Sequence, residues 1–113
     1  MIVSELTPIP GHKFRFNFES FKLIPKHAGC YVISSHDNMI LYIGLAVNLN
    51  SRFMQHLNNP EKTSPTTEGK PIWFYYLEYD QNNLNVLERS WMNQYSARYG
   101  RRPILNKKDS PIS

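Results

Sequence analysis

The sequence predicts a single α/β domain of the α+β type, in which a small three-stranded antiparallel sheet is flanked by helices. Three short runs rich in β-branched and aromatic residues are bounded by turn residues or loops, which is typical of antiparallel strands. Two longer segments instead carry apolar residues at helical spacing. The length of 113 residues suits one domain with a modest hydrophobic core.

Composition and charge limit the class of protein. Hydrophobic residues make up 41% and aromatic residues 13% of the chain, which is a globular composition. The single cysteine excludes an internal disulfide, no apolar run is long enough to span a membrane, and no signal peptide is evident. We therefore expect a soluble, cytoplasmic protein. The net charge of +4 is compatible with a polyanionic partner and equally with ordinary variation among small proteins.

Residues 1–23 are expected to form an N-terminal extension that packs on the domain. Within it, Phe14, Phe16 and Phe18 alternate with polar residues, which predicts a short strand with one aromatic face. We expect these rings to pack against the domain, and stacking on nucleic-acid bases is the alternative.

A β-hairpin is predicted from residues 29–35 and 39–44, joined by turn residues. A loop with an even number of residues places Tyr31 and Tyr42 on the same face of the sheet, because side chains alternate along a strand. A loop with an odd number places them on opposite faces. With the even loop, the other face carries a second apolar set, which consists of Cys30, Val32, Leu41 and Ile43.

Residues 47–57 are predicted to form a helix with Asn48 as its N-cap. Its buried stripe repeats every four residues and consists of Leu49, Phe53 and Leu57. Arg52 and His56 lie one turn apart on the neighbouring stripe, at the edge of the core. Taken alone, each of the two is more often a solvent-exposed side chain. Residues 58–70 show no periodicity and are expected to be a loop, whose length suggests function or mobility.

The last predicted elements are a strand over residues 71–78 and a helix over residues 84–99, which Gly100 ends. The apolar stripe of this helix consists of Leu84, Leu87, Trp91 and Tyr95. Glu88 lies on the same side and has no Lys or Arg three or four positions away. A half-buried carboxylate without a partner is costly unless a metal ion or a distant arginine pairs with it. The alternative is a carboxylate that reaches water at the edge of the stripe.

The order of these residues resembles the GIY-YIG nuclease family. The residues that carry the resemblance are Gly29-Cys30-Tyr31, Tyr42-Ile43-Gly44, Arg52, His56, Glu88 and Asn106. An ordered set of this length is far more specific than either tripeptide alone. The resemblance covers residues 24–107 as a nuclease domain and leaves residues 108–113 as a frayed tail. The chain departs from the family at Cys30, which stands in place of Ile, and after Gly44, where many members carry a Lys.

The resemblance implies a GIY-YIG-like fold and a metal-dependent DNA endonuclease that hydrolyses phosphodiester bonds. It implies catalytic roles for Tyr31, Tyr42, Arg52, His56 and Glu88. Glu88 would bind the metal, Mg²⁺ or Mn²⁺, because a carboxylate is a hard oxygen ligand. Which of the two tyrosines and the histidine accepts the proton stays open.

The resemblance also implies which residues support the site and which contact DNA or another partner. Structural support is expected from Gly29, Gly44 and Asn106, and contacts with DNA from Arg52, Arg98, Arg101 and Arg102. Target choice would come from the N-terminal segment, the 58–70 loop, a homodimer or a separate recognition partner. The alternative function is a non-catalytic nucleic-acid-binding module on the same fold.

Overall fold

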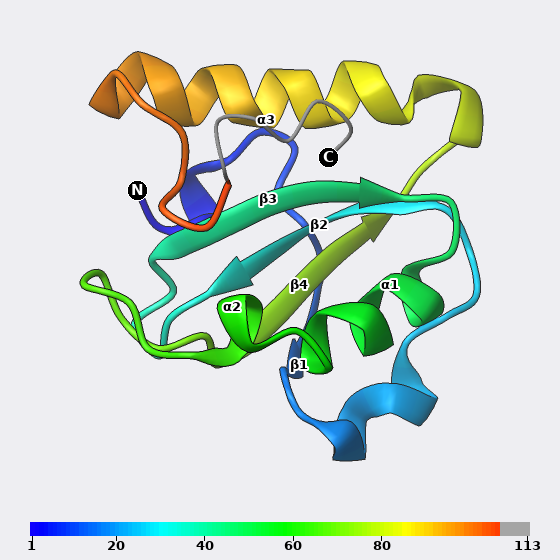
Figure 1. The fold of residues 1–113 in the computed structure, drawn as a ribbon. Helices are drawn as coiled ribbons and strands as arrows, with labels where there is room; N and C mark the ends of the chain where they lie inside the picture. Colours follow the sequence, from blue (N-terminus) through cyan, green and yellow to red (C-terminus); the bar gives the residue numbers. More distant parts are fainter. Residues whose placement is uncertain (107–113) are drawn as a thin grey trace.

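Four antiparallel strands form the sheet of the computed structural model, which describes residues 1–106 (Figure 1). They are β1 (His12–Arg15), β2 (Gly29–Ser34), β3 (Ile40–Ala46) and β4 (Trp73–Glu78), in the order β1-β4-β2-β3. The predicted number of three strands is therefore wrong. The alternation of phenylalanines indicated a strand near the N-terminus, but not its pairing with β4, in which His12 lies opposite Tyr76. The tail predicted for residues 108–113 lies outside the described residues.

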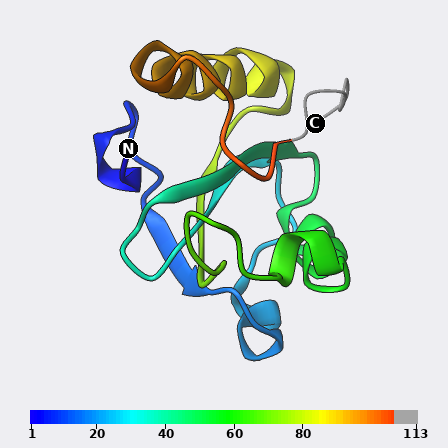
Figure 2. The same ribbon diagram turned by 60° about the vertical axis from the view of Figure 1, so that its left-hand side comes forward.

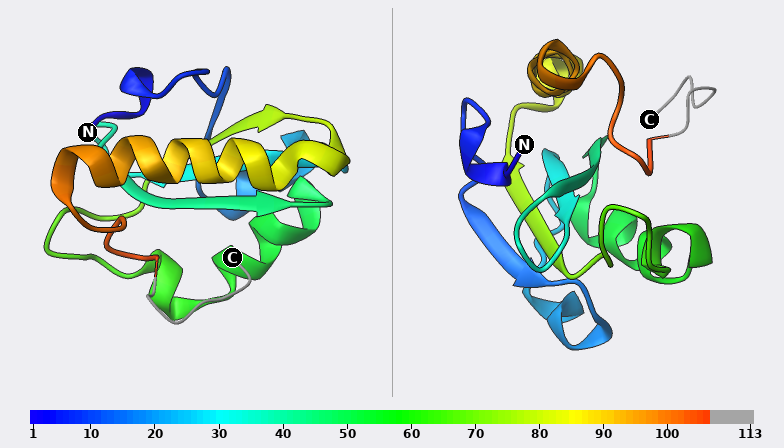
Figure 3. Two further views of the ribbon diagram at one scale, coloured as in Figure 1. Left: turned by 90° about the horizontal axis from the view of Figure 1, so that it is seen from above. Right: turned by 90° about the vertical axis from the view of Figure 1, so that its left-hand side faces the viewer.

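Helices cover both faces of the sheet (Figures 1 and 3). Helix α3 (Leu84–Tyr99) lies on one face, while α1 (Leu49–Leu57) and the short α2 (Pro60–Thr63) lie on the other. Three 3₁₀ turns complete the described chain: η1 (Val3–Glu5), η2 (Phe18–Leu23) and η3 (Gln81–Asn83). The bounds of α3 are those predicted, and Gly100 ends the helix with a φ of 71°.

Two hydrophobic cores lie on the two faces of the sheet. The core beneath α1 includes Tyr31, Ile33, Leu49, Phe53 and Phe74. The core beneath α3 includes Cys30, Val32, Ile43, Leu87 and Trp91. Leu41 was predicted to share the second core but packs in the first. The reason is a β-bulge, because Ile33 pairs with Tyr42 and Ser34 with Ile40, which leaves Leu41 without a cross-strand partner.

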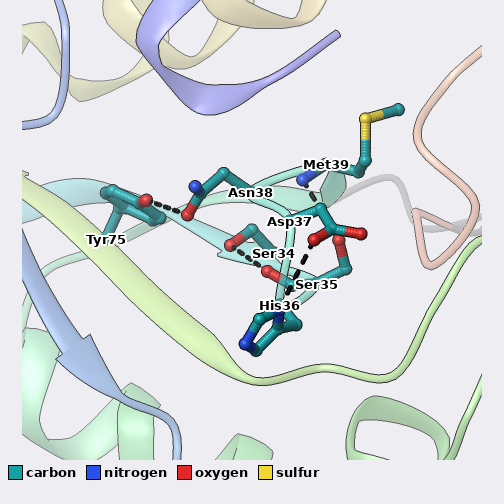
Figure 4. Close-up of polar contacts among 7 residues, drawn as sticks. All are labelled: Ser34, Ser35, His36, Asp37, Asn38, Met39 and Tyr75. Atoms are coloured by element: carbon teal, nitrogen blue, oxygen red, sulfur yellow. Dashed lines mark hydrogen bonds and ion pairs between the residues drawn. The ribbon is translucent and has the colours of Figure 1, made fainter.

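The turn between β2 and β3 is held by its own side chains (Figure 4). Asn38 adopts a left-handed conformation with a φ of 67°, which asparagine tolerates better than most residues. Its side-chain oxygen accepts a hydrogen bond from the Tyr75 hydroxyl of β4. The Met39 amide donates to the Ser35 hydroxyl at 3.1 Å. The turn is thereby tied to the middle of the sheet, and this fixes the hairpin register.

The segment 58–70 contains a helical turn that the sequence analysis did not predict (Figure 2). Asn59 caps this turn, since its side chain accepts a hydrogen bond from the Glu61 amide, and Pro60 occupies the first helical position. The turn is too short to show an apolar period, so hydrophobic periodicity did not reveal it. Across residues 1–106, none of the helices combines the length and the apolar character that crossing a membrane requires.

Candidate active site

Tyr31 and Tyr42 lie on the same face of the β2–β3 hairpin, with ring centroids 5.9 Å apart. They are not directly opposite, because Tyr31 pairs with Gly44 and Tyr42 with Ile33. The Tyr31 ring extends across Gly44, where a Cβ atom would lie only 2.5 Å from the Tyr31 hydroxyl oxygen. Glycine at position 44 is therefore a steric requirement of the buried tyrosine.

His56 reaches the same cluster from α1. Its Nε2 atom lies 2.6 Å from the Tyr31 hydroxyl oxygen, and both side chains are buried. Burial is the main cause that lowers the pKa of His56 to about 3, and the charges of Lys62 and Arg52 contribute to the same decrease. The imidazole is therefore neutral near pH 7. Burial also raises the pKa of Tyr31 well above its usual range, so the pair is neutral as a whole.

Arg52 lies on α1, one turn before His56, and points back towards β3. Its Nη1 atom donates a hydrogen bond to the Leu45 carbonyl at 3.1 Å. Burial raises the pKa of Tyr42, while a hydrogen-bonding interaction with Tyr31 and the charge of Arg52 oppose this increase. The guanidinium thus lies within electrostatic reach of both tyrosines.

Glu88 approaches from the other side of the sheet. It lies half-buried on α3, whereas the tyrosines face α1. The two sides meet at β3, because β3 is an edge strand of the sheet. Burial is the main cause of the raised pKa of Tyr42, and the negative charge of Glu88 makes a smaller contribution in the same direction. Among residues 1–106, its carboxylate has no hydrogen bond or ion pair.

Asn106 pairs with the outer edge of β3 as a neighbouring strand would. Its Oδ1 atom accepts a hydrogen bond from the Ile43 amide at 2.9 Å, and its Nδ2 atom donates to the Ile43 carbonyl at 2.8 Å. The Leu105 amide adds a third bond, to the Leu41 carbonyl. At the other end of the hairpin, a Cβ atom on Gly29 would lie 2.5 Å from the Leu77 carbonyl oxygen. The hydrogen bonds of Asn106 and Leu105 secure β3, which carries Tyr42. The absence of a side chain at Gly29 lets β2, which carries Tyr31, lie close to β4.

The arginines at the end of α3 lie apart from this cluster. Arg98 forms an ion pair with Glu5 at 2.9 Å, and Arg101 forms one with Glu68 at 2.7 Å. Arg102 lines a surface pocket beside Arg101. Their roles in DNA binding remain predictions, and carboxylates offset the charges of Arg98 and Arg101.

The described residues contain no group of three or more His, Cys, Asp or Glu side chains that could hold a metal ion. A cage of protein ligands is therefore absent from residues 1–106. A single carboxylate without a protein partner, as at Glu88, suits Mg²⁺, because this ion retains several water molecules. The donor set thus fits one hydrated, oxygen-bound cation at Glu88.

The position of Lys62 beside the cluster was not predicted from the sequence. It is the charged residue of α2 that lies against the Tyr42 ring. Its Nζ atom lies 4.9 Å from the centre of the Tyr42 ring, and its charge lowers the pKa of His56. The only sequence signal was Asn59 followed by Pro60, a helix-start pattern that places Lys62 on the third residue of a turn.

Comparison with known proteins gives a consistent result. The model of the GIY-YIG catalytic domain matches residues 27–101. The UvrABC system protein C of Mycoplasma genitalium is 31% identical over 83 residues, which are 72% of this chain and 14% of that protein. The protein of the same name from Thermoanaerobacter pseudethanolicus is 38% identical over 95 residues, or 80% of this chain and 15% of that protein. The chain thus spans about one seventh of the length of these curated relatives.

A solved structure has a similar fold. It is the GIY-YIG N-terminal endonuclease domain of UvrC from Thermotoga maritima, bound to its catalytic divalent cation, magnesium. The TM-score is 0.56 and the sequence identity 20%, with 79% of this chain and 93% of that chain covered. At this identity the likeness shows the fold alone.

Proposed function

Because this chain belongs to the GIY-YIG catalytic domain family, we propose that it is a DNA endonuclease that hydrolyses phosphodiester bonds with the help of one divalent metal ion. The observation that carries the proposal is the hydrogen bond between Tyr31 and His56, in a cluster that Tyr42, Arg52 and Glu88 all influence. A site for phosphodiester hydrolysis needs a proton acceptor, a cation for the phosphate and a metal ligand. These residues supply all three.

The proton acceptor in this proposal is His56, which acts through the two tyrosines. Tyr42 retains 6% exposure, whereas Tyr31 is fully buried behind it. A water molecule at Tyr42 would give its proton to the Tyr42 oxygen. Tyr42 would pass its own proton to Tyr31, and Tyr31 would pass its proton to His56 Nε2. The hydroxide that remains would attack phosphorus, and the leaving oxygen would take a proton from water as its bond to phosphorus breaks.

The low pKa of His56 in the free protein opposes proton uptake, so this path requires bound DNA to raise that pKa. In the free protein, burial and the nearby cations Lys62 and Arg52 disfavour the imidazolium. A phosphodiester carries a negative charge, and an opposite charge nearby favours the protonated imidazole. Bound DNA would therefore raise the pKa of His56, which the proposed proton transfer requires.

Arg52 would bind the phosphate oxygens, because its guanidinium offers several N–H donors in one plane. Glu88 would hold the metal ion, Mg²⁺ or Mn²⁺, at the edge of β3. When bound, such an ion polarises a phosphoryl oxygen and stabilises the leaving oxygen. Arg52 and a metal ion held by Glu88 would both offset negative charge on the phosphate.

The test is incubation of the protein with supercoiled plasmid DNA and Mg²⁺, Mn²⁺ or EDTA. We expect nicked and linear products with a metal ion and intact plasmid with EDTA. Mapping of the ends would identify the bond that is cleaved. DNA binding without cleavage under every metal condition would contradict the proposal and would support a non-catalytic nucleic-acid-binding module instead.

A further inference from the structure

Lys62 occupies an unusual place for a lysine. Its side chain is only 9% exposed, although lysines are almost never buried without a compensating interaction. The short helix α2 holds it there: the Lys62 amide donates to the Asn59 carbonyl at 2.9 Å, and Asn59 caps the turn. The backbone of α2 therefore fixes the position from which the Lys62 side chain extends.

The ammonium group lies against the candidate site rather than in open water. It is 4.9 Å from the centre of the Tyr42 ring, a cation–π geometry that stabilises the charge by its attraction to the ring face. Lys62 lies on α2 and Arg52 on α1, so the two cations approach the tyrosine–histidine cluster from different helices. Only Arg52 was expected from the sequence.

We propose that Lys62 is a second phosphate-binding residue of this site and contacts the DNA backbone beside Tyr42, opposite the guanidinium of Arg52. This inference rests on the proposed endonuclease function. Two cations on different elements can contact different oxygens of one phosphodiester or two successive phosphates. A lysine acts there as a point charge, while arginine supplies directed donors. The low exposure keeps the charge away from bulk water, so its attraction to a phosphate is screened less than on an open surface.

The experiment compares wild type with Lys62→Met, which keeps a similar length and removes the charge. Binding to a duplex oligonucleotide is measured in EDTA over a range of salt, and plasmid cleavage is measured with Mg²⁺. Loss of one phosphate contact should reduce the slope of log Kd against log salt by about 0.9 and lower the cleavage rate by about 10²-fold. Lys26→Met is the matched control, because Lys26 is exposed before β2 and lies outside both the N-terminal segment and the 58–70 loop, and it should leave both quantities unchanged.

Two further variants keep the test decisive. Lys62→Arg should restore the salt slope, since it restores the charge. If Lys62→Met unfolds in a thermal melt, Lys62→Gln replaces it in the same comparison. A wild-type salt slope and wild-type cleavage in a folded, uncharged variant would overturn the role of Lys62 and leave the endonuclease standing. Absence of metal-dependent cleavage by the wild type would instead reject the proposed function itself.

Discussion

At the scale of single residues, the chemistry depends on how deeply each group is buried. Tyr31 and His56 are both almost inaccessible to water, and their mutual hydrogen bond satisfies each of them. Replacing one partner leaves the other as a buried polar group without a bond, which is costly. The pair is therefore both a structural feature of the core and the proposed proton path.

The first prediction concerns the pH dependence of stability. The pKa of His56 is about 3 in the folded protein and near 6.5 when unfolded, so the unfolded chain binds more protons between these values. The contribution of neutral His56 is complete above pH 6.5 and is lost as the pH falls towards 3. Its slope approaches about 1.4 kcal/mol per pH unit.

Denaturant unfolding at several pH values measures this contribution. His56→Gln should give a flatter dependence of the unfolding free energy on pH than the wild type. His36→Gln is the control, because the side chain of His36 is 85% exposed. If the unfolding free energy of wild type and of His56→Gln depended on pH in the same way, the imidazole of His56 would not be held neutral by its burial.

The second prediction concerns Gly44. A Cβ atom at this position would lie 2.5 Å from the Tyr31 hydroxyl oxygen and 2.8 Å from the Tyr42 ring. Gly44→Ala should therefore displace Tyr31 and destabilise the protein by about 1 to 3 kcal/mol, the range for overpacking a core. Gly11→Ala is the control, since a Cβ atom there meets nothing within 4 Å. Equal melting temperatures for the two variants would contradict the tight packing of Tyr31 on Gly44.

At the scale of secondary-structure elements, the edge strand β3 is the most consequential. It carries Tyr42 on the face that α1 covers, whereas Glu88 lies on α3 at the opposite face. An open edge strand has unpaired backbone groups. Here Asn106 and Leu105 satisfy three of these groups from the segment that follows α3 (Figures 1 and 3).

The third prediction follows from that pairing. Asn106→Ala removes two hydrogen bonds to Ile43 and should destabilise the protein by about 1 to 2 kcal/mol, because water can replace part of what is lost. Asn93→Ala is a suitable control on the exposed face of α3. Denaturant unfolding of both variants measures the difference. Wild-type stability in Asn106→Ala would show that the side chain does not secure β3.

Long elements with a regular apolar pattern could be predicted from the sequence. Short elements and contacts between distant parts of the chain could not. The apolar stripe through Leu84 and Trp91 predicted α3 with its observed bounds. The bulge at Leu41 left no local signal, since it depends on how Ser34 pairs with Ile40. The turn α2 escaped because four residues cannot show a helical period.

The candidate site shows the same division. The tripeptides and their spacing led to Tyr31 and Tyr42, and their shared face is confirmed by the structure. The partnership of Tyr31 with His56 is a tertiary contact between β2 and α1, which spacing along the chain does not encode. Lys62 was missed for the same reason, because only the folded chain brings α2 against Tyr42.

At the scale of the whole molecule, the proposed site would span one edge of the sheet and combine side chains from both of its faces. A positively charged protein that binds DNA through phosphates releases counterions, and each contact contributes about −0.9 to the slope of log K against log salt. The fourth prediction is that binding to duplex DNA weakens steeply between low and physiological salt. Equilibrium titrations measure this, and a flat dependence would contradict the nucleic-acid partner.

In the proposed nuclease site, Glu88 would hold the metal ion from the far side of β3. Glu88→Gln keeps the shape of the side chain and removes the negative charge that would hold the cation. It should abolish plasmid cleavage in Mg²⁺, while DNA binding persists or strengthens because one repulsive charge is lost. Its melting temperature should remain unchanged or rise, because the carboxylate has no ion pair among residues 1–106.

The decisive measurement is plasmid cleavage by wild type, Glu88→Gln and Glu19→Gln, beside thermal melts of all three. Glu19 is exposed on η2, so its variant carries the same charge change away from the site. We expect wild type and Glu19→Gln to cleave the plasmid and a fully folded Glu88→Gln to leave it intact. Cleavage by Glu88→Gln at the wild-type rate would contradict the metal-binding role of Glu88.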